Sequence, residues 1–455
     1  MSRDELSQAI YNKYIVPTQR PAQDHIGVEF EFPIVNLSGD AVDFDVVHAV
    51  TQKFLAEFGF VPAAVDDEGS VNSAADPVTG DDLSFDCSYN TIEFSFGKEH
   101  DINVLSARFR RYIGFLQKEL RANGHLVTGA GINPHHAVNR NEPIPNGRYR
   151  MLFHHLSSYP MYRNRKAFHT MPNFGLIACA SQTHIDVSEE ELTTAINAFS
   201  RIEPLKALLF ANSVYGDYLC VRDHLWRDSL HGLNPHNVDS YQEEVGSVEE
   251  LVDYIRSMSL FCLDRDGKYI NIAPTPLEEY FSAGSIKGEY YYGTGYADIV
   301  FEPRIEDLEY LRSYKFVDLT FRGTLELRSI CEQPVSEVFA APAFHAGLKA
   351  NLPVFAEYLR ENRIYPEGFT LQELRDAFVR KDLPPWADRE RLSGALLDLL
   401  EIASAGLALR GYGEEHFLEP LYRRAENLLS PGREMVEGIA AGKPESYYIN
   451  KYGEL

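Results

Sequence analysis

The most informative residues near the start of the chain are two glutamates that stand two positions apart. Glu29 and Glu31 lie in the strand-like residues 27–32, where alternation sends the Val and Phe side chains to the opposite face. Two carboxylates on one face repel each other unless a cation lies between them. The pattern therefore favours a metal site, although a half-buried strand whose polar face meets water alternates in the same way.

Three further strand-like segments repeat this arrangement, with acidic, imidazole or guanidinium groups sharing one face. Their polar residues are Glu93 in residues 91–96, preceded by Asp86; Gln182, His184 and Asp186 in residues 181–186; and Glu326 and Arg328 in residues 324–328. Any single segment of this kind is best explained as ordinary half-buried sheet. Four of them in one chain favour a shared site that binds a hard metal ion.

The type of ligand indicates which ion fits. Carboxylate oxygens beside a single imidazole suit Mg²⁺, which prefers oxygen ligands and substrate phosphates, with Mn²⁺ as the alternative. Zinc more often takes several His or Cys ligands. The sequence has no GxxxxGK loop and no GxGxxG turn after a strand. If ATP binds, metal-bridged carboxylates and an arginine must hold it, and these suffice because phosphoryl transfer depends on positioning and charge neutralisation.

The composition excludes several classes of partner. The 455 residues include 67 Asp and Glu against 43 Lys and Arg, which gives a net charge of −24 and argues against nucleic acid. Five scattered cysteines without CxxC spacing argue against a disulfide framework and favour a cytoplasmic location. The first residues lack the apolar core of a signal peptide, and no stretch approaches the length needed to cross a bilayer, so we expect no membrane partner.

Strands and helices mix without a regular rhythm, which predicts an α+β fold with an antiparallel sheet. Helices are predicted at residues 46–57, 103–123, 189–214, 248–257, 393–409 and 418–429, and a capping box at Thr370 and Glu373 begins another. We divide the chain into a catalytic sheet region, residues 1–335, and a helical region, residues 336–455, packed together as one compact domain. Residues 284–296, rich in Tyr and Gly, are predicted to form a mobile loop, either a lid over a nucleotide or an exposed interaction loop.

Six motifs occur along the first three quarters of the chain. They are G-x-E-x-E at residues 27–31, the Asp86 to Glu93 segment, GAGINP at 129–134, GRYRM at 147–151, QTHID at 182–186 and LELRS at 325–329. In this order they resemble the glutamate–cysteine ligase (γ-glutamylcysteine synthetase) superfamily of carboxylate–amine ligases, over about residues 20–335. Each motif alone is weak, whereas the ordered set is specific. Residues 86–90 depart from the plant-type pattern, so the identity of the amine substrate stays open.

The resemblance implies a fold like that of glutamine synthetase, in which a curved antiparallel sheet forms a funnel surrounded by helices. It also implies ligands for two or three Mg²⁺ ions, namely Glu29, Glu31, Asp86, Glu93, His184 and Glu326. Arg328 would face the γ-phosphate of ATP as the catalytic residue. Arg148 and Gln182 would bind and position the substrates.

The activity that the resemblance implies is ATP-dependent ligation. The γ-carboxylate of glutamate would attack ATP to give an acyl phosphate, which the amine of cysteine captures to give γ-glutamylcysteine, the first step of glutathione synthesis. The alternative is a related ligase that uses another amine or amino acid. Two other classes stay open: a metalloenzyme without ATP, against which the Glu326 and Arg328 pair argues, and a non-catalytic descendant of the ligase, against which retention of every expected ligand argues.

Overall fold

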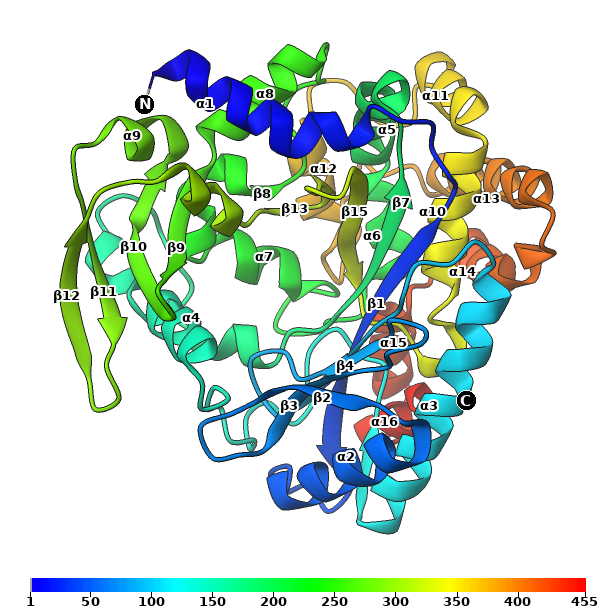
Figure 1. Ribbon diagram of the computed structural model, residues 1–455. Helices are drawn as coiled ribbons and strands as arrows, with labels where there is room; N and C mark the ends of the chain where they lie inside the picture. The colour runs from blue at the N-terminus through cyan, green and yellow to red at the C-terminus, as the bar shows by residue number, and fades with distance from the viewer. Residues whose placement is uncertain (1) are drawn as a thin grey trace.

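Nine strands form the central antiparallel sheet of the molecule (Figure 1). The computed structural model describes residues 2–455. Eight of the strands lie in the order β14-β15-β7-β1-β5-β4-β3-β2, and β6 pairs with β1. Their bounds are β1 Ile26–Asn36, β2 Val61–Val65, β3 Val71–Ala75, β4 Asp82–Ser84, β5 Thr91–Ser95, β6 His125–Val127, β7 Ala180–Asp186, β14 Val317–Leu319 and β15 Thr324–Cys331. The predicted α+β fold is confirmed, and all four strand-like segments are strands of this one sheet.

The strand β1 lies between β5 and β7, and its side chains alternate between an apolar face and a polar face of the sheet. Phe30 and Phe32 on its apolar face are fully buried. Phe109 of α3 (Ile102–Ala122) packs edge-on against Phe30 and stacks on Phe32, and Phe339 also packs against Phe30. Helices therefore cover the apolar face, and the two glutamates of β1 point to the other side.

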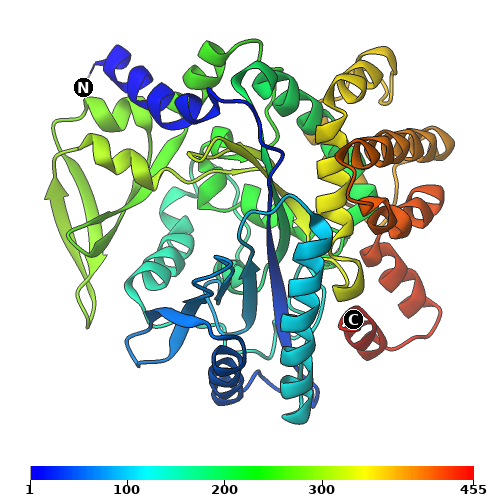
Figure 2. The ribbon, with the colours of Figure 1, turned by 45° about the vertical axis from the view of Figure 1, so that its right-hand side comes forward.

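The helices that cover the sheet include several that the sequence predicts. The predictions at residues 46–57, 103–123 and 248–257 are confirmed by α2 (Phe44–Phe58), α3 and α8 (Val248–Ser257). Figure 2 shows α3, in cyan, alongside β1, in blue. The single helix predicted at residues 189–214 is wrong, because α5 (Glu189–Arg201) is followed by a separate helix α6 (Glu203–Phe210). Pro204 cannot donate a backbone hydrogen bond to α5, so it begins the next helix instead.

The tyrosine-rich residues 284–296 form most of a β-hairpin, so the prediction of a mobile loop is wrong. A second antiparallel sheet, seen at the left of Figure 1, contains β9 Ser259–Arg265, β10 Lys268–Pro276, β11 Ile286–Tyr291 and β12 Tyr296–Phe301. Tyrosine favours strands, and this preference outweighs the glycines of the segment. Only residues 292–295 form the turn, where Gly293 has a positive φ of 104°.

The C-terminal part of the chain is built from helices. They are α10 Ala340–Ala350, α11 Leu352–Glu361, α12 Leu371–Phe378, α13 Arg389–Arg410, α14 Glu419–Asn427, α15 Pro431–Ala440 and α16 Glu445–Tyr452. The predicted capping box is confirmed: the Thr370 hydroxyl accepts a hydrogen bond from the Glu373 N–H, and the Glu373 carboxylate accepts one from the Thr370 N–H. The helix predicted at residues 393–409 is confirmed by α13, which Gly411, with a φ of 80°, ends.

The helix α13 is long and apolar enough to cross a membrane, so the expectation that no stretch approaches this length is wrong for this helix. Length and composition are weak evidence, because a core helix passes the same test. Eight residues of α13 are buried inside the protein, among them Leu396, Leu400 and Leu407. The apolar side chains of α13 therefore have a packing role within the fold.

The crossing of α10 and α13 depends on two glycines that let the backbones touch. A Cβ atom on Gly406 would lie 1.9 Å from the carbonyl oxygen of Gly347, and one on Gly347 would lie 2.2 Å from the carbonyl oxygen of Ala403. Real Cβ atoms do not approach backbone oxygens this closely. Any side chain at either position must therefore push the two helices apart.

We expect Gly406→Ala to lower the free energy of unfolding by about 2 kcal/mol or more, because it overpacks this crossing. Gly394→Ala is a matched control on the same helix, where an added Cβ meets no atom within 4 Å. The control should be neutral or stabilising by roughly 1 kcal/mol, since alanine favours helix. Urea unfolding followed by circular dichroism measures both, and equal effects would contradict the close helix contact.

Candidate active site

The polar face of the sheet carries two groups of candidate metal ligands that meet at β1. Cluster A is Glu29, His184 and Glu326, and cluster B is Glu31, Asp86 and Glu93. In each cluster, one ligand atom from every residue lies within 4.8 Å of the others. The strand register accounts for the grouping, because Glu31 stands directly opposite Glu93 and His184 directly opposite Glu326. The six residues chosen from the sequence therefore form two compact sites rather than one.

Cluster A combines carboxylates with a cationic environment. The Nε2 atom of His184 lies 3.0 Å from the carboxylate of Glu29. Burial acts to raise the pKa of Glu29, but the hydrogen bond and charge of His184, together with Arg328 and Arg322, outweigh it and lower this pKa. Burial likewise acts to lower the pKa of His184, and the nearby carboxylates of Glu29 and Glu326 raise it overall.

Cluster B holds three carboxylates whose negative charges are little offset by nearby cationic groups. Burial, with the nearby charge of Asp86, raises the pKa of Glu31 to about 8. Burial also raises the pKa of Asp86, and it raises that of Glu93 strongly, with added repulsion from Glu29, Asp86 and Glu31. The three groups favour protonation or a cation, because like charges this close cannot all be ionised without one.

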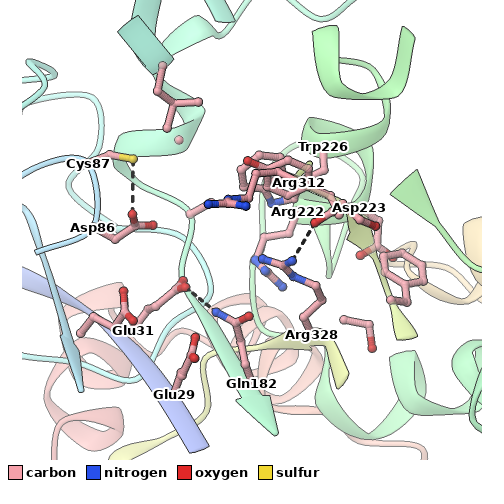
Figure 3. A pocket seen from close by; sticks show the side chains of 18 of the residues that line it. Glu29, Glu31, Asp86, Cys87, Gln182, Arg222, Asp223, Trp226, Arg312 and Arg328 are labelled. Carbon is pink, nitrogen blue, oxygen red and sulfur yellow. Dashed lines mark hydrogen bonds between the residues drawn. The ribbon is translucent and has the colours of Figure 1, made fainter. Parts of the chain in front are cut away.

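The orientation of Glu31 is fixed by hydrogen bonds to its side chain and to its backbone. Its carboxylate accepts hydrogen bonds from the Ala180 N–H at 2.7 Å and from the Gln182 side-chain amide at 2.9 Å (Figure 3). Its backbone N–H donates to the buried carboxylate of Glu332 at 2.9 Å, which also accepts from the Ser181 hydroxyl. Glu31 is therefore held in place by hydrogen bonds that leave it facing Asp86 and Glu93.

Asp86 reaches cluster B from the turn between β4 and β5. The next residue, Cys87, has a φ of 61°, which is unusual for a non-glycine residue and closes the turn tightly. The Cys87 thiol donates to the Asp86 carboxylate at 3.4 Å (Figure 3). Burial raises the pKa of this thiol well above its usual range, so Cys87 contributes a neutral group.

A cavity of about 240 Å³ lies between the acidic face of the sheet and a set of arginines. Figure 3 shows the carboxylates of Glu29, Glu31 and Asp86 on one side of this cavity and the guanidinium groups of Arg222, Arg312 and Arg328 on the other. The two residues predicted to bind substrate, Arg148 and Gln182, both line it. Arg148 comes from the first turn of α4 (Gly147–Ser157), where its guanidinium lies over the ring of Tyr149.

Arg328 points into the cavity from the same face of β15 as Glu326, and the strand changes register beside it. Leu327 pairs with Thr183 and Ile330 with Ser181, so Arg328 and Ser329 together stand opposite a single residue of β7. Such a bulge interrupts the regular hydrogen-bond ladder at the end of the strand. The guanidinium of Arg328 donates to the Ser313 carbonyl at 2.8 Å and lies 3.5 Å from the Glu326 carboxylate.

Several cavity residues are not among those chosen from the sequence. Arg222 and Trp226 come from one face of α7 (Val221–Arg227), and Arg312, Asp223 and Tyr314 also line the cavity. The only sequence signal for this group is the spacing of Arg222 and Trp226, which places both on one helix face. Among the residues that the structure describes, the Nε of Arg222 and the side-chain oxygen of Gln182 are buried without a hydrogen-bond partner. Such unpaired polar atoms beside a cavity favour a polar ligand.

A second cavity of about 350 Å³ adjoins cluster A. Glu29, His184 and Glu326 border it, and so does Asp318, which stands opposite Glu326 in the β14–β15 pair. The rest of its wall combines apolar and aromatic side chains with four arginines; the apolar and aromatic residues are Tyr14, Tyr241, Ile255, Met258, Leu311, Leu319 and Phe321, and the arginines are Arg148, Arg312, Arg322 and Arg328. Cluster A therefore borders a second cavity that offers arginines beside apolar and aromatic side chains.

The donor atoms of both clusters fit hard divalent cations. Cluster B offers only carboxylate oxygens, and cluster A adds one imidazole, which is the set expected for Mg²⁺ or Mn²⁺. The raised pKa values of cluster B describe carboxylates whose mutual repulsion a cation would relieve. The arginines across the cavity could receive the phosphates or carboxylates of a bound substrate.

Comparison with known proteins agrees with this geometry. The family model described as glutamate-cysteine ligase family 2 (GCS2) matches residues 25–438. The chain is 24% identical to the chloroplastic glutamate–cysteine ligase of Nicotiana tabacum, covering 68% of this chain and 56% of that protein, and 22% identical to that of Solanum lycopersicum, with the same coverage. The chain thus spans little more than half the length of these relatives. A crystal structure of a glutamate–cysteine ligase from Francisella tularensis in complex with AMP has the same fold, with a TM-score of 0.50 and 11% identity over 94% of this chain and 87% of that one.

We expect the metal-free protein to lose stability as the pH rises from about 5 to about 8. The pKa of Glu31 is raised in the folded state, so the folded chain keeps a proton that the unfolded chain releases near pH 4.5, and each such group lowers stability by up to about 1.4 kcal/mol per pH unit over this range. Urea unfolding in the presence of EDTA measures the profile. Millimolar Mg²⁺ should abolish the loss, because it binds the ionised carboxylates.

The substitution Glu93→Gln should raise the stability of the metal-free protein at pH 7.5 by about 1–2 kcal/mol and make its pH profile shallower, because it removes one of three repelling charges. The control Glu426→Gln makes the same change at an exposed position on α14 and should have little effect. A flat profile for the unsubstituted protein would contradict the charge repulsion described for cluster B. So would equal effects of the two substitutions.

Proposed function

The chain belongs to glutamate-cysteine ligase family 2, and from this premise we propose that it joins the γ-carboxylate of glutamate to the amine of cysteine with ATP. The single observation that carries the proposal is the meeting of clusters A and B at β1, on the wall of a cavity whose opposite wall carries Arg328. Two carboxylate clusters facing arginines suit a reaction between a carboxylate and a triphosphate, which otherwise repel each other.

In the proposed site, the residues of cluster A and cluster B hold two or three Mg²⁺ or Mn²⁺ ions, with ATP as the co-substrate. When bound, these ions neutralise the charge between the phosphates and the attacking carboxylate. The second cavity receives ATP next to cluster A, since its aromatic and aliphatic side chains suit the adenosine and its arginines suit the phosphates. This arrangement directs the γ-phosphate toward Arg328 and leaves the first cavity for the amino acids.

The reaction proceeds in two steps that the cavity residues support. An oxygen of the γ-carboxylate attacks the γ-phosphorus, and the bond to ADP breaks to give an acyl phosphate. The planar guanidinium of Arg328 stabilises the charge on the transferring phosphoryl group. The amine then attacks the acyl carbon, phosphate leaves, and the amine releases a proton as the amide forms. Arg148 and Gln182 hold the substrates in position for both steps.

The acceptor amine is the least constrained part of the proposal. Cys87 lies within residues 86–90, the segment that departs from the plant-type pattern, and it lines the cavity together with Leu152 and Ala178. A related ligase with another amine is therefore the second candidate function. The same metal and nucleotide arrangement would serve it.

We expect ATP turnover by the purified protein to require glutamate, an amine and Mg²⁺ together. Mass spectrometry of products from glutamate with a panel of amines, including cysteine, identifies the acceptor. A γ-glutamyl product formed fastest with cysteine supports the first candidate, and one formed fastest with another amine supports the second. Equal ATP turnover in the absence of any amino acid would contradict the ligase proposal.

We also expect Arg328→Ala to lower kcat by about a thousandfold, in line with other arginines that contact a transferring phosphoryl group. Glu29→Ala should abolish ligation, because it removes a residue of cluster A. The control Arg360→Ala changes an exposed residue of α11 that pairs with Glu357 on the same helix, and it should keep full activity. Steady-state kinetics with thermal unfolding distinguishes lost chemistry from lost folding, and near-normal activity of Glu29→Ala would refute the site.

A further inference from the structure

One buried arginine of the C-terminal helices contacts three residues of the cavity wall. Arg375, on α12, is 2% exposed and lies beside Asp223, Phe316 and Ser329, all of which line the cavity of about 240 Å³. We infer that Arg375 is a positioning residue for the proposed ligase reaction, through which the C-terminal helices set the places of Arg222 and Arg328. The inference rests on the proposed function for its kinetic consequences and on the contacts alone for its structural ones.

The first contact fixes α7. The Nε and one Nη atom of Arg375 donate to the two carboxylate oxygens of Asp223 at 2.6 and 3.2 Å, a bidentate pair with little freedom to rotate. Asp223 follows Arg222 in the chain and stands three residues before Trp226, and both of these line the cavity. Holding Asp223 therefore fixes the helix that presents them.

The second and third contacts fix the strand that carries Arg328. The bulge of β15 leaves the Ser329 carbonyl outside the regular ladder, and Arg375 donates to it at 3.2 Å. The guanidinium of Arg375 also lies 4.5 Å from the ring centre of Phe316, whose carbonyl accepts the backbone N–H of Arg328. Arg375 thus contacts both the residue that follows Arg328 and the residue that accepts the backbone N–H of Arg328.

The geometry requires arginine rather than any cation. The remaining Nη atom donates to the carbonyl and to the carboxylate of Glu203 at 2.7 and 2.8 Å, so all five N–H groups of the guanidinium are used. Lys206 pairs with the same Glu203 at 2.8 Å, which gives two buried cations and two buried anions. A lysine at this position would keep the charge balance but has three donors on one atom and cannot span these partners.

The test compares Arg375→Lys with Arg424→Lys. Arg424, on α14, is equally buried, and it donates to the Leu209 carbonyl, to the Gln333 side chain and to Glu337. None of these three partners lines the cavity. We expect Arg375→Lys to lower kcat by about tenfold or more while the KM for ATP changes little, because the reacting groups shift, whereas none of the contact residues of Arg375 lines the second cavity. Arg424→Lys should lose comparable thermal stability but keep its kcat.

A second measurement reports the position of α7 without any reaction. The chain has two tryptophans, so Trp386→Phe leaves Trp226 on α7 as the single emitter. In that background Arg375→Lys should shift the fluorescence emission of Trp226, and Arg424→Lys should not. Equal kcat losses in the two variants, or unchanged Trp226 emission, would overturn the inference. If the unsubstituted protein showed no glutamate-dependent turnover, the proposed function would fail, and the emission measurement would still decide the role of Arg375.

Discussion

The electrostatic repulsion among the carboxylates of β1 and its neighbours is the constraint on which the rest of the structure depends. Glu29 and Glu31 point to the same face of one strand, and Glu93 stands directly across from Glu31. Burial and mutual repulsion raise the pKa of Glu31 and Glu93, so the folded chain holds these groups in an unfavourable state. The apolar face behind them must fix the register, because a slip of one residue would turn these acids into the core. The packing of Phe30 and Phe32 on Phe109 opposes that slip, because it would move both rings out of the core.

The two charged walls of the cavity have different structural origins. The acids come mostly from the interiors of adjacent strands, where hydrogen-bond ladders fix their spacing. The arginines come from separate segments: Arg148 from the start of α4, Arg222 from α7, Arg312 from a loop, and Arg328 from a bulge. A rigid acidic wall facing arginines from independent elements suits an anionic ligand that contacts metal ions on one side and guanidinium groups on the other.

Strand alternation explains how much of this could be predicted from the sequence. The period of two is local, so it identified β1, β5, β7 and β15 and the face on which each acid lies. The order of the strands in the sheet depends on contacts between residues far apart in the chain. The sequence therefore predicts the six ligands as one set and not as two clusters. Arg222 and Arg312 lie outside any strand pattern, and nothing in the sequence relates them to the sheet. The tyrosines and glycines of residues 284–296 predict a loop, whereas the structure has two short strands, β11 and β12, joined by a glycine-containing turn.

The bulge in β15 connects the sheet chemistry to the C-terminal helices. Glu326 and Arg328 lie on the same face of β15, 3.5 Å apart, and both line the second cavity. The bulge at the end of this alternation leaves the carbonyls of Ser329 and Ile330 in need of donors. Arg375 and Arg222 supply those donors, at 3.2 and 3.3 Å. The residues that satisfy the irregular backbone are thus also residues that charge or shape the cavity, which gives a helical region without a recognisable motif a contact with the cavity wall.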